Sequence, residues 1–281
     1  MKLYDNLQES ITGLNTSAQN LMLGINALDN VLKGIEPGSV VVIEGRADNG
    51  RAEMFNTLIC NIAIKQSRPS LILNISTLES EFYNRLFSAL TNTDIDIVRK
   101  SPADIWTKHS DKLQKTNCDI EFLRFAPIKD IAACIREYAA AGVEIVFIDL
   151  FQAIDDDGDN RYCISERCSK LLYSLAKEYK ITIILTSNIY PTEERIGGIR
   201  EKQPTLADLA PFGQLDEFSD VVISLFVPEI YNISEDLQGN DLTGQALVSI
   251  IKNTLNQKLT SVCLYYDAQH FKMEGTQLWN A

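Results

Sequence analysis

Short apolar runs alternate with longer amphipathic stretches along most of the chain. The apolar runs occupy residues 40–43, 71–75, 145–149, 181–186 and 221–226. Helical periodicity fills the sequence between them, at residues 52–66, 79–90, 129–141 and 164–179. Uninterrupted apolar strands that alternate with helices are typical of a mostly parallel sheet covered by helices on both faces. The pattern predicts such an α/β domain, extended by a C-terminal β-hairpin over residues 246–252 and 261–267.

A second periodicity lies at the N-terminus. Leu3, Leu7 and Ile11 recur every four residues and form one apolar stripe on a short helix. A helix this short is stable only when its apolar face is buried. We therefore expect a short docking helix over residues 1–12, followed by one α/β domain over residues 13–281.

Composition and charge narrow the classes of function. The chain has 281 residues, a formal net charge of −12 and a pI near 4.7, which opposes non-specific binding to nucleic acid. It has no signal-peptide pattern and no apolar run of about 18 residues, so we expect a cytoplasmic protein with no membrane partner. The six cysteines form no C-x-x-C pair and only two histidines are present, which favours reduced thiols over a structural zinc site.

Residues 40–52 combine a buried-type strand with an altered phosphate-binding loop. In the motif G-x-x-x-x-G-K-[ST], backbone amides hold phosphate, the lysine reaches the β- and γ-phosphates, and the hydroxyl binds Mg²⁺. Gly45 and Gly50 keep the frame, but Arg51 replaces the lysine and Ala52 replaces the hydroxyl residue. The loop amides can still accept phosphate, whereas the metal loses a protein ligand. Arg51 has two interpretations, a phosphate contact or a solvated residue in the first turn of a helix.

Asp149 ends the apolar run 145–149. An acid at this place is what a Walker B element needs to position a carboxylate beside Mg²⁺. The alternative is a turn aspartate that caps the next element. The phosphate loop in the same chain favours the Walker B interpretation.

The order of these motifs resembles the C-terminal, RecA-like motor domain of DnaB-type replicative helicases, over roughly residues 12–274. The matching segments are residues 12–16 with 28–29, 45–50, 147–152, 159–161 with 175–178, and 208–209 with 220. The resemblance implies a RecA-like P-loop NTPase fold, ATP with Mg²⁺ as ligand, assembly into a ring, and single-stranded DNA. It also implies a metal ligand at Asp149 and a nucleotide site formed by Gly45, Arg46, Asn49, Gly50, Arg51, Asp149 and Gln152.

The departures from the family pattern fall on its functional residues. The catalytic glutamate position holds Ser76, and the polar sensor glutamine is Asn188. Glu79 lies close to Ser76, although Ser76-x-x-Glu79 also fits a helix capping box. The Lys-x-Arg that reaches a neighbouring subunit becomes Lys252-Asn253-Thr254, so the resemblance predicts no arginine finger. The strand-gripping Arg-Glu-Ser becomes residues 210–212, Ala-Pro-Phe.

A polar stretch between Ile189 and Pro211 occupies the place where the family's loops contact single-stranded DNA. Its basic residues include Arg195, Arg200 and Lys202, but three glutamates balance them and the aromatic residues are limited to Tyr190 and Phe212. We expect weak DNA binding, and a solvated loop is the alternative.

Asp155, Asp157, Asp159 and Glu166 fall at positions 1, 3, 5 and 12 of an EF-hand loop. Position 6 is Asn160 where the calcium loop requires glycine, and the flanking segments are a strand and a helix. We therefore interpret this segment as an acidic surface connection.

The sequence leads to one functional hypothesis and two alternatives. The leading hypothesis is a DnaB-like motor domain with a degenerate ATPase site, which serves replication or recombination by assembling into a RecA-like ring or binding a protein partner. ATP binding is then weak and largely independent of Mg²⁺. The first alternative is an active ATP-dependent DNA helicase whose divergent site uses Arg51, Asp149, Glu79 and Asn188. The second is a nucleotide-sensing domain without turnover.

Overall fold

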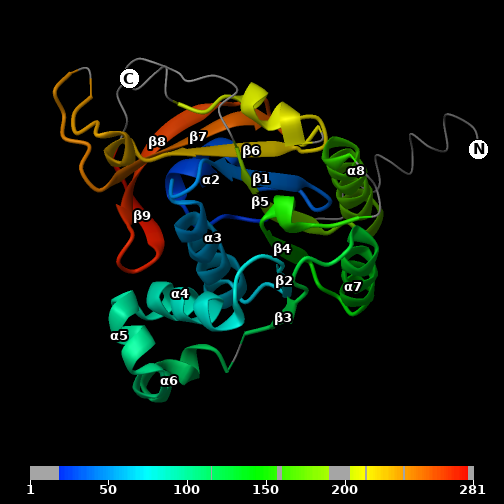
Figure 1. The fold of residues 1–281 in the computed structure, drawn as a ribbon, viewed down its shortest axis with the longest axis horizontal. Helices are drawn as coiled ribbons and strands as arrows, with labels where there is room; N and C mark the ends of the chain where they lie inside the picture. The colour runs from blue at the N-terminus through cyan, green and yellow to red at the C-terminus, as the bar shows by residue number, and fades with distance from the viewer. Residues whose placement is uncertain are drawn as a thin grey trace, which may run out of the picture.

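The computed structural model describes residues 19–114, 116–156, 160–189, 203–212, 214–236 and 238–277. Within these ranges, nine strands form one sheet in the order β3-β2-β4-β5-β1-β6-β7-β8-β9 (Figure 1). The strands are β1 (Val40–Gly45), β2 (Ser70–Asn74), β3 (Cys118–Phe122), β4 (Ile145–Asp149), β5 (Thr182–Asn188), β6 (Val221–Phe226), β7 (Gln245–Asn253), β8 (Thr260–Asp267) and β9 (Lys272–Gln277). In this order, the first six strands, from β3 across to β6, run parallel to one another. β7, β8 and β9 continue the sheet with antiparallel pairing.

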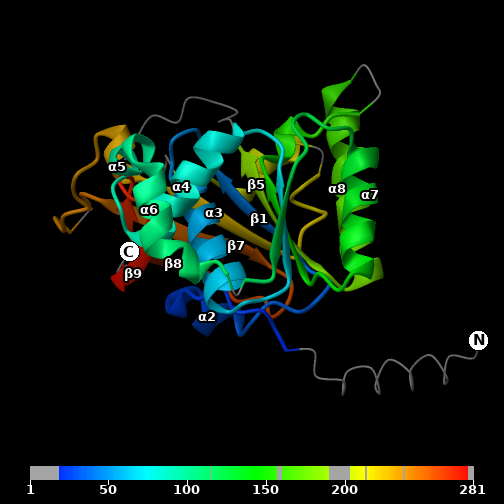
Figure 2. The same cartoon turned by 90° about the horizontal axis from the view of Figure 1, so that it is seen from below.

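Helices cover both faces of the parallel part of the sheet. On one face lie α3 and α4, with α5 and α6 beyond them, and on the other lie α7 and α8 (Figure 2). Their bounds are α3 (Arg51–Ile59), α4 (Glu79–Thr91), α5 (Ile95–Lys100), α6 (Pro102–His109), α7 (Ile128–Ala140) and α8 (Arg161–Tyr179), with α2 (Asn26–Leu32) preceding the sheet. The short helical segments are the π-helix η1 (Cys60–Lys65) and the 3₁₀ turns η2 (Ser110–Lys112), η3 (Phe151–Ala153), η4 (Leu206–Phe212) and η5 (Pro228–Tyr231).

The alternation of side chains along β1 explains why its apolar run is unbroken. Val41 and Ile43 pack into the core that includes α3, whereas Val40 and Val42 pack into the core that includes α7 and α8. Because both faces are buried, every side chain of the strand must be apolar or have a hydrogen-bond partner inside the protein. This arrangement confirms the predicted covered parallel sheet and its C-terminal hairpin extension.

Five of the described α-helices and strands were not predicted from the sequence: α2, α5, α6, β3 and β9. β3 is an edge strand in which Asp119 and Glu121 alternate with apolar residues, so it lacks an apolar run. β9 contains one large apolar residue, Met273. The predicted docking helix over residues 1–12 lies outside the described residues. No helix in the described part has the length and apolar character needed to span a bilayer.

The topology gathers candidate residues at one edge of the sheet. This edge is the one at which the parallel strands β1, β2, β4 and β5 have their carboxyl ends. The phosphate loop and Ser76 follow β1 and β2, whereas Asp149 and Asn188 are the last residues of β4 and β5. Ligands of open α/β sheets bind at such an edge.

Candidate functional site

The phosphate loop has the strand–loop–helix geometry that its sequence predicts. β1 ends at Gly45, and α3 begins at Arg51 directly after Gly50, whose φ of 78° lies in the left-handed region. A Cβ atom at Gly50 would also lie 2.1 Å from the Cε atom of Met273 on β9. The backbone conformation therefore favours glycine here, and the end of the Met273 side chain would have to move to admit any other residue. The loop leads into a helix N-terminus, the geometry that favours a bound anion.

The side chains of Arg46 and Asn49 face η5. Asn49 accepts a hydrogen bond from the Val227 N–H (3.0 Å) and donates one to the Tyr231 hydroxyl (3.1 Å). Arg46 also donates to this hydroxyl (3.3 Å), and its guanidinium lies 5.5 Å from the centre of the ring. The ring of Tyr231 in turn stacks on Phe226. Tyr231 therefore anchors the loop, a role that sequence reasoning missed because no local pattern links it to the loop.

Arg51 does not extend freely into solvent. Its guanidinium donates a hydrogen bond to the side-chain oxygen of Asn188 at the end of β5. Gln152 fixes Asn188 by accepting from its backbone N–H (3.0 Å) and donating to its carbonyl oxygen (2.9 Å). Three predicted site residues are thus brought together, and the interpretation of Arg51 as a merely solvated helix residue is wrong.

Asp149 lies beside the end of β2. Its Oδ2 atom accepts hydrogen bonds from the hydroxyls of Ser76 (2.9 Å) and Thr77 (2.8 Å). The alternative role of Asp149 as a cap is wrong, because the N-cap residue of η3 is Leu150 and no side chain caps this turn. Leu150 has a φ of 69° and donates its N–H to the Thr186 hydroxyl. Thr77 is a further residue of this cluster that the sequence did not reveal.

The capping-box interpretation of Ser76 and Glu79 is also wrong. The N-cap residue of α4 is Leu78, no side chain caps the helix, and the Ser76 hydroxyl donates to Asp149 instead. Glu79 is exposed in the first turn of α4. The site therefore presents hydroxyls, and not a second carboxylate, to Asp149.

Lys252 and Thr254 lie at the opposite edge of the sheet, where β6 begins. The Lys252 ammonium donates to the carbonyl oxygens of Asp216 (2.5 Å), Glu217 (3.2 Å) and Ser219 (2.5 Å). Burial lowers the pKa of this ammonium. The Thr254 N–H donates to the Asp220 carbonyl.

Two acids of the family-like segments also have structural partners. The Asp220 carboxylate accepts from the Val40 N–H (2.8 Å) and pairs with Lys177 (2.9 Å). Asp208 accepts from the N–H (2.7 Å) and the hydroxyl (3.1 Å) of Thr205. Asp220 therefore ties the start of β6 to β1 and α8, whereas these bonds of Asp208 are local to the start of η4.

Several predicted residues lie outside the described part of the chain. These are the DNA-contact candidates Arg195, Arg200 and Lys202, with Tyr190, and the calcium candidates Asp157 and Asp159. Of the remaining calcium candidates, Glu166 pairs with Lys170 (2.5 Å). The DNA-binding expectation stays a prediction.

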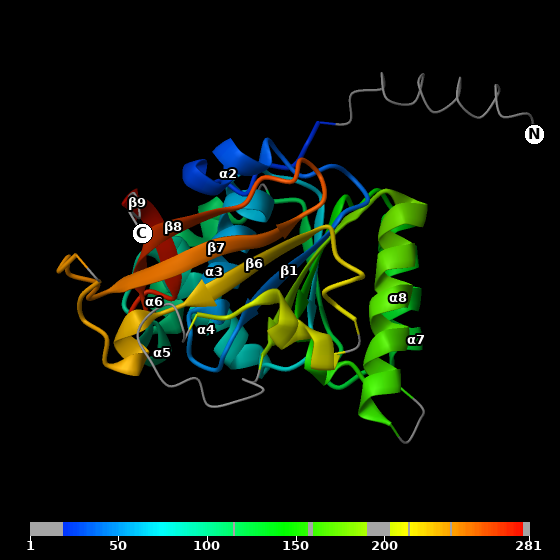
Figure 3. The same cartoon turned by 90° about the horizontal axis from the view of Figure 1, so that it is seen from above.

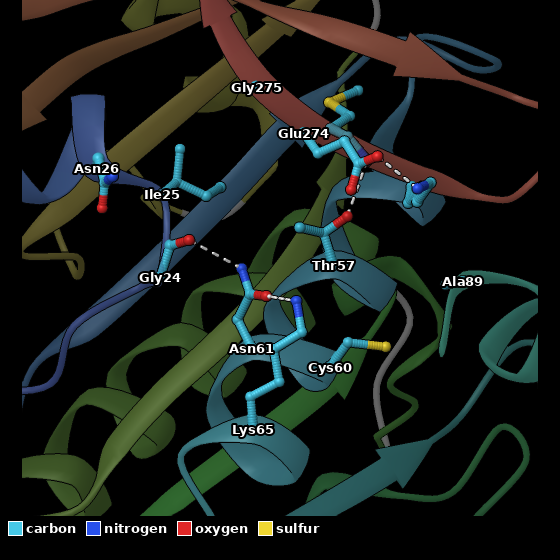
Figure 4. A pocket seen from close by; sticks show the side chains of 12 residues that line it. Gly24, Ile25, Asn26, Thr57, Cys60, Asn61, Lys65, Ala89, Glu274 and Gly275 are labelled. Atoms are coloured by element: carbon cyan, nitrogen blue, oxygen red, sulfur yellow. Dashed lines mark hydrogen bonds and ion pairs between the residues drawn. The ribbon is translucent and has the colours of Figure 1, made fainter. Parts of the chain in front are cut away.

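A separate hollow of about 230 Å³ lies between the segment before α2, the end of α3 and β9 (Figure 4). Its polar groups bind one another. The Asn61 amide donates to the carbonyls of Leu23 (3.3 Å) and Gly24 (3.2 Å), and Lys65 donates to the Asn61 side-chain oxygen (2.9 Å). The Thr57 hydroxyl accepts from the Met273 N–H. This hollow lies where three segments of the fold meet, and no residue of the phosphate loop lines it.

Solved structures with the same fold include an ATPase domain that aligns with a TM-score of 0.78 and 19% identity, covering 96% of both chains. The structure of a DnaB-like replicative helicase and its interactions with primase gives the same TM-score and identity, covering 96% of this chain and 65% of that one. The fold is therefore the expected RecA-like ATPase fold.

Sequence relatives point to the same family. The replicative DNA helicase DnaB of Buchnera aphidicola subsp. Baizongia pistaciae is 26% identical over 248 residues, covering 85% of this chain and 51% of that protein. DnaB of Pasteurella multocida is 24% identical over 240 residues, covering 82% of this chain and 49% of that protein. The chain thus spans about half the length of these curated relatives. The family model described as the DnaB-like helicase C terminal domain matches residues 20–275, and the chain belongs to this family.

Proposed function

We propose that this chain is a DnaB-like module of DNA replication or recombination that joins a RecA-like ring or binds a protein partner without hydrolysing ATP. One observation carries the proposal. Arg51 occupies the position of the phosphate-binding lysine, and its guanidinium bonds Asn188 within the same chain. A planar guanidinium fork does not replace a compact ammonium at a tight phosphate site. Ala52, the next residue, has no side-chain oxygen to offer Mg²⁺.

The neighbourhood of Asp149 supports the same proposal. The family's catalytic glutamate position is occupied by Ser76, whose hydroxyl donates to Asp149. A neutral hydroxyl does not accept a proton from an attacking water as a carboxylate base can. Asp149 itself remains at the Walker B position, where Mg²⁺ would bind if it bound at all.

The segment around Lys252 and Thr254, which in the family would reach a neighbouring subunit, also supports the proposal. Thr254 stands where the family has its arginine finger, a group worth roughly 10³ to 10⁵ in rate. Lys252, two residues earlier, donates to three carbonyl oxygens of its own chain. Neither residue is arranged to stabilise charge on a γ-phosphate bound elsewhere.

A reversion experiment tests the proposal at the loop. We expect titration calorimetry of the full chain to show weak ATP binding with little dependence on Mg²⁺. The double variant Arg51→Lys/Ala52→Thr should gain affinity and Mg²⁺ dependence, because the loop frame is intact and only its chemistry has changed. Arg136→Lys, an exposed substitution on α7, is the control and should leave binding unchanged. Strongly Mg²⁺-dependent binding by the unmodified chain would overturn the proposal.

Nucleotide sensing without turnover is the second candidate function. The left-handed Gly50 and the start of α3 at Arg51 favour it, since this backbone geometry suits a phosphate whatever side chains follow. Micromolar ATP binding that is indifferent to Mg²⁺, without hydrolysis, would support this candidate over a pure assembly role.

A further inference from the structure

The turn between β3 and α7 holds an aromatic residue in a backbone conformation that few residues adopt. The Ala126 N–H donates to the Leu123 carbonyl (3.1 Å), which closes a four-residue turn with Arg124 and Phe125 at its centre. Phe125 has a φ of 52°, in the left-handed region. Glycine or asparagine ordinarily occupies a left-handed turn position, because a Cβ atom is strained there. Phenylalanine at this position therefore destabilises residues 123–126, here called the Phe125 turn.

Packing does not compensate for this strain. Phe125 is 57% exposed, whereas Leu123 and Ala126 pack against the core that includes α7 and α8. The Arg124 guanidinium lies 5.3 Å from the centre of the Phe125 ring, and Arg124 is itself exposed. Neither the backbone nor the core thus favours a phenylalanine. A residue kept in a strained conformation without a structural benefit is evidence for a function.

Backbone hydrogen bonds hold the Phe125 turn at the carboxyl edge of the sheet. The Leu123 N–H donates to the Asn74 carbonyl (3.0 Å), and the Phe125 N–H donates to the Ile75 carbonyl (3.1 Å). Ile75 directly precedes Ser76 of the candidate site. The turn leads into α7, which lies beside α8 on one face of the sheet (Figure 3). The ring is therefore presented on a rigid support, at the edge where open α/β sheets bind ligands.

The charges near the turn restrict the way in which a ligand can be held. The exposed cations Arg124 and Lys129 stand beside the exposed acids Asp130 and Asp155, and residues 155–157 are all aspartates. This corner is not basic, so it cannot bind a nucleic acid through many phosphates. Stacking on an exposed ring needs no excess of positive charge. Every nucleobase has a π face, and an arginine beside the ring adds to the attraction.

A protein partner fits the turn less well than a nucleobase does. Aromatic anchors of protein interfaces lie in well-packed pockets surrounded by other contacts. Within residues 123–130, Phe125 is the one exposed apolar side chain, and the other exposed residues are Arg124, Lys129 and Asp130. An isolated ring beside a guanidinium instead matches the stacking platforms of proteins that bind single strands.

We propose that the Phe125 turn is a stacking platform for a base of single-stranded nucleic acid. The proposal rests on the proposed function, which places the chain in DNA replication or recombination, but not on the absence of ATP hydrolysis. It also does not use the loop residues Arg195, Arg200 and Lys202. Its failure would leave the proposed function intact, because ATP binding and phosphate release are measured at the phosphate loop.

Fluorescence anisotropy of the full chain tests the platform. The probes are a labelled oligothymidylate of about 16 nucleotides and an abasic strand of the same length. We expect binding to the oligothymidylate alone, weakened only about threefold between about 50 and 200 mM salt, as one phosphate contact would give. Phe125→Ala should weaken it about tenfold, and Phe125→Tyr should retain it. Tyr265→Ala, which removes a ring of similar exposure (58%) on β8, is the control and should leave binding unchanged.

Thermal denaturation separates a binding role from a structural one at the same position. Phe125→Gly should keep or raise the Tm, because glycine relieves the left-handed conformation, while its binding falls as in Phe125→Ala. A Tm lower by more than a few degrees would show that the ring serves the fold and would overturn the proposal.

Three binding results also overturn the proposal. The first is equal affinity for the abasic strand, and the second is unchanged affinity in Phe125→Ala. The third is no binding of the oligothymidylate at protein concentrations up to about 100 µM, the weak end of non-specific binding. With an unchanged Tm in Phe125→Gly, that third result would assign the exposed ring to a protein partner.

Discussion

Arg51 shows how one side chain changes the character of a whole site. In place of a lysine directed at a nucleotide, the chain has a guanidinium that bonds Asn188, and Gln152 holds Asn188 in place. The charged Arg51 side chain is thus held at the end of β5, the strand next to β1. A nucleotide would have to compete with this contact.

The contact between Arg51 and Asn188 should be measurable as a coupling. We expect a double-mutant cycle of Arg51→Ala and Asn188→Ala to give an interaction free energy of about 1.5 kcal/mol, the lower end of the range for a hydrogen bond to a charged group, because the pair is only partly buried. Urea denaturation of the four proteins checks this value. Additive effects would mean that the two side chains do not stabilise one another.

Glu44 on β1 gives the fold a predictable dependence on pH, because complete burial raises the pKa of its carboxyl to about 8. The folded protein keeps this proton up to about pH 8, whereas the unfolded chain releases it near the ordinary value of 4.5. Between these values the folded state binds more protons, so the stabilisation is complete below about pH 4.5 and is lost as the pH rises to about 8. The loss should be on the order of 5 kcal/mol.

The measurement is the free energy of unfolding in urea at several pH values. Glu44→Gln should remove this part of the pH dependence, and subtracting its profile from that of the unmodified chain isolates the contribution of Glu44. Parallel profiles for the two proteins would show that Glu44 is ionised in the folded state.

The C-terminal hairpin supports the phosphate loop at the level of elements. β9 places Met273 against Gly50, and the hydroxyl of Tyr266 on β8 lies 3.5 Å from Glu53 on α3. Burial raises the pKa of Glu53, and its own backbone N–H, Arg85 and the Tyr266 hydroxyl offset only part of this rise. The loop conformation is therefore maintained by strands more than 200 residues away in sequence.

Two glycine substitutions separate backbone strain from packing. Gly50 and Gly239 have φ values of 78° and 81°, but a Cβ would collide with Met273 only at Gly50, whereas Gly239 faces open space. Gly50→Ala should therefore cost about 1 kcal/mol more than Gly239→Ala by thermal or urea denaturation, because the end of the flexible Met273 side chain can shift. Met273→Ala should reduce this difference. Equal costs for the two substitutions would mean that β9 does not pack against the loop.

Local signals explain which parts of the fold could be predicted. The strands 71–75 and 221–226 are continuous apolar runs, and the phosphate loop is a contiguous motif, so both were predictable. β3 was missed because its acids break the run at a sheet edge. The contacts of Tyr231 with Arg46 and of Thr77 with Asp149 join segments distant in sequence, and only the folded sheet brings them together. The capping interpretation was wrong because the Ser76 hydroxyl donates to Asp149, at the end of the neighbouring strand β4.

At the level of the whole molecule, the N-terminal stripe and Thr254 bear on the oligomeric state. The apolar stripe of Leu3, Leu7 and Ile11 requires a surface, in the same chain or in a neighbour. Because Thr254 stands at the arginine-finger position and lacks the charge for a γ-phosphate contact that would favour a ring, we expect a monomer or weak oligomer. Sedimentation velocity of the full chain and of a form lacking residues 1–12 checks this. A stable hexamer that dissociates on truncation would contradict the expectation.

The central claim is that the site does not turn over ATP. It is tested most directly by steady-state phosphate release from the full chain with Mg²⁺ and ATP, with and without single-stranded DNA. We expect no release above background in either condition, because the lysine, hydroxyl, glutamate and arginine-finger positions hold Arg51, Ala52, Ser76 and Thr254. Turnover at about 1 s⁻¹ or faster, abolished by Asp149→Ala, would contradict the account and identify an active helicase with a divergent site.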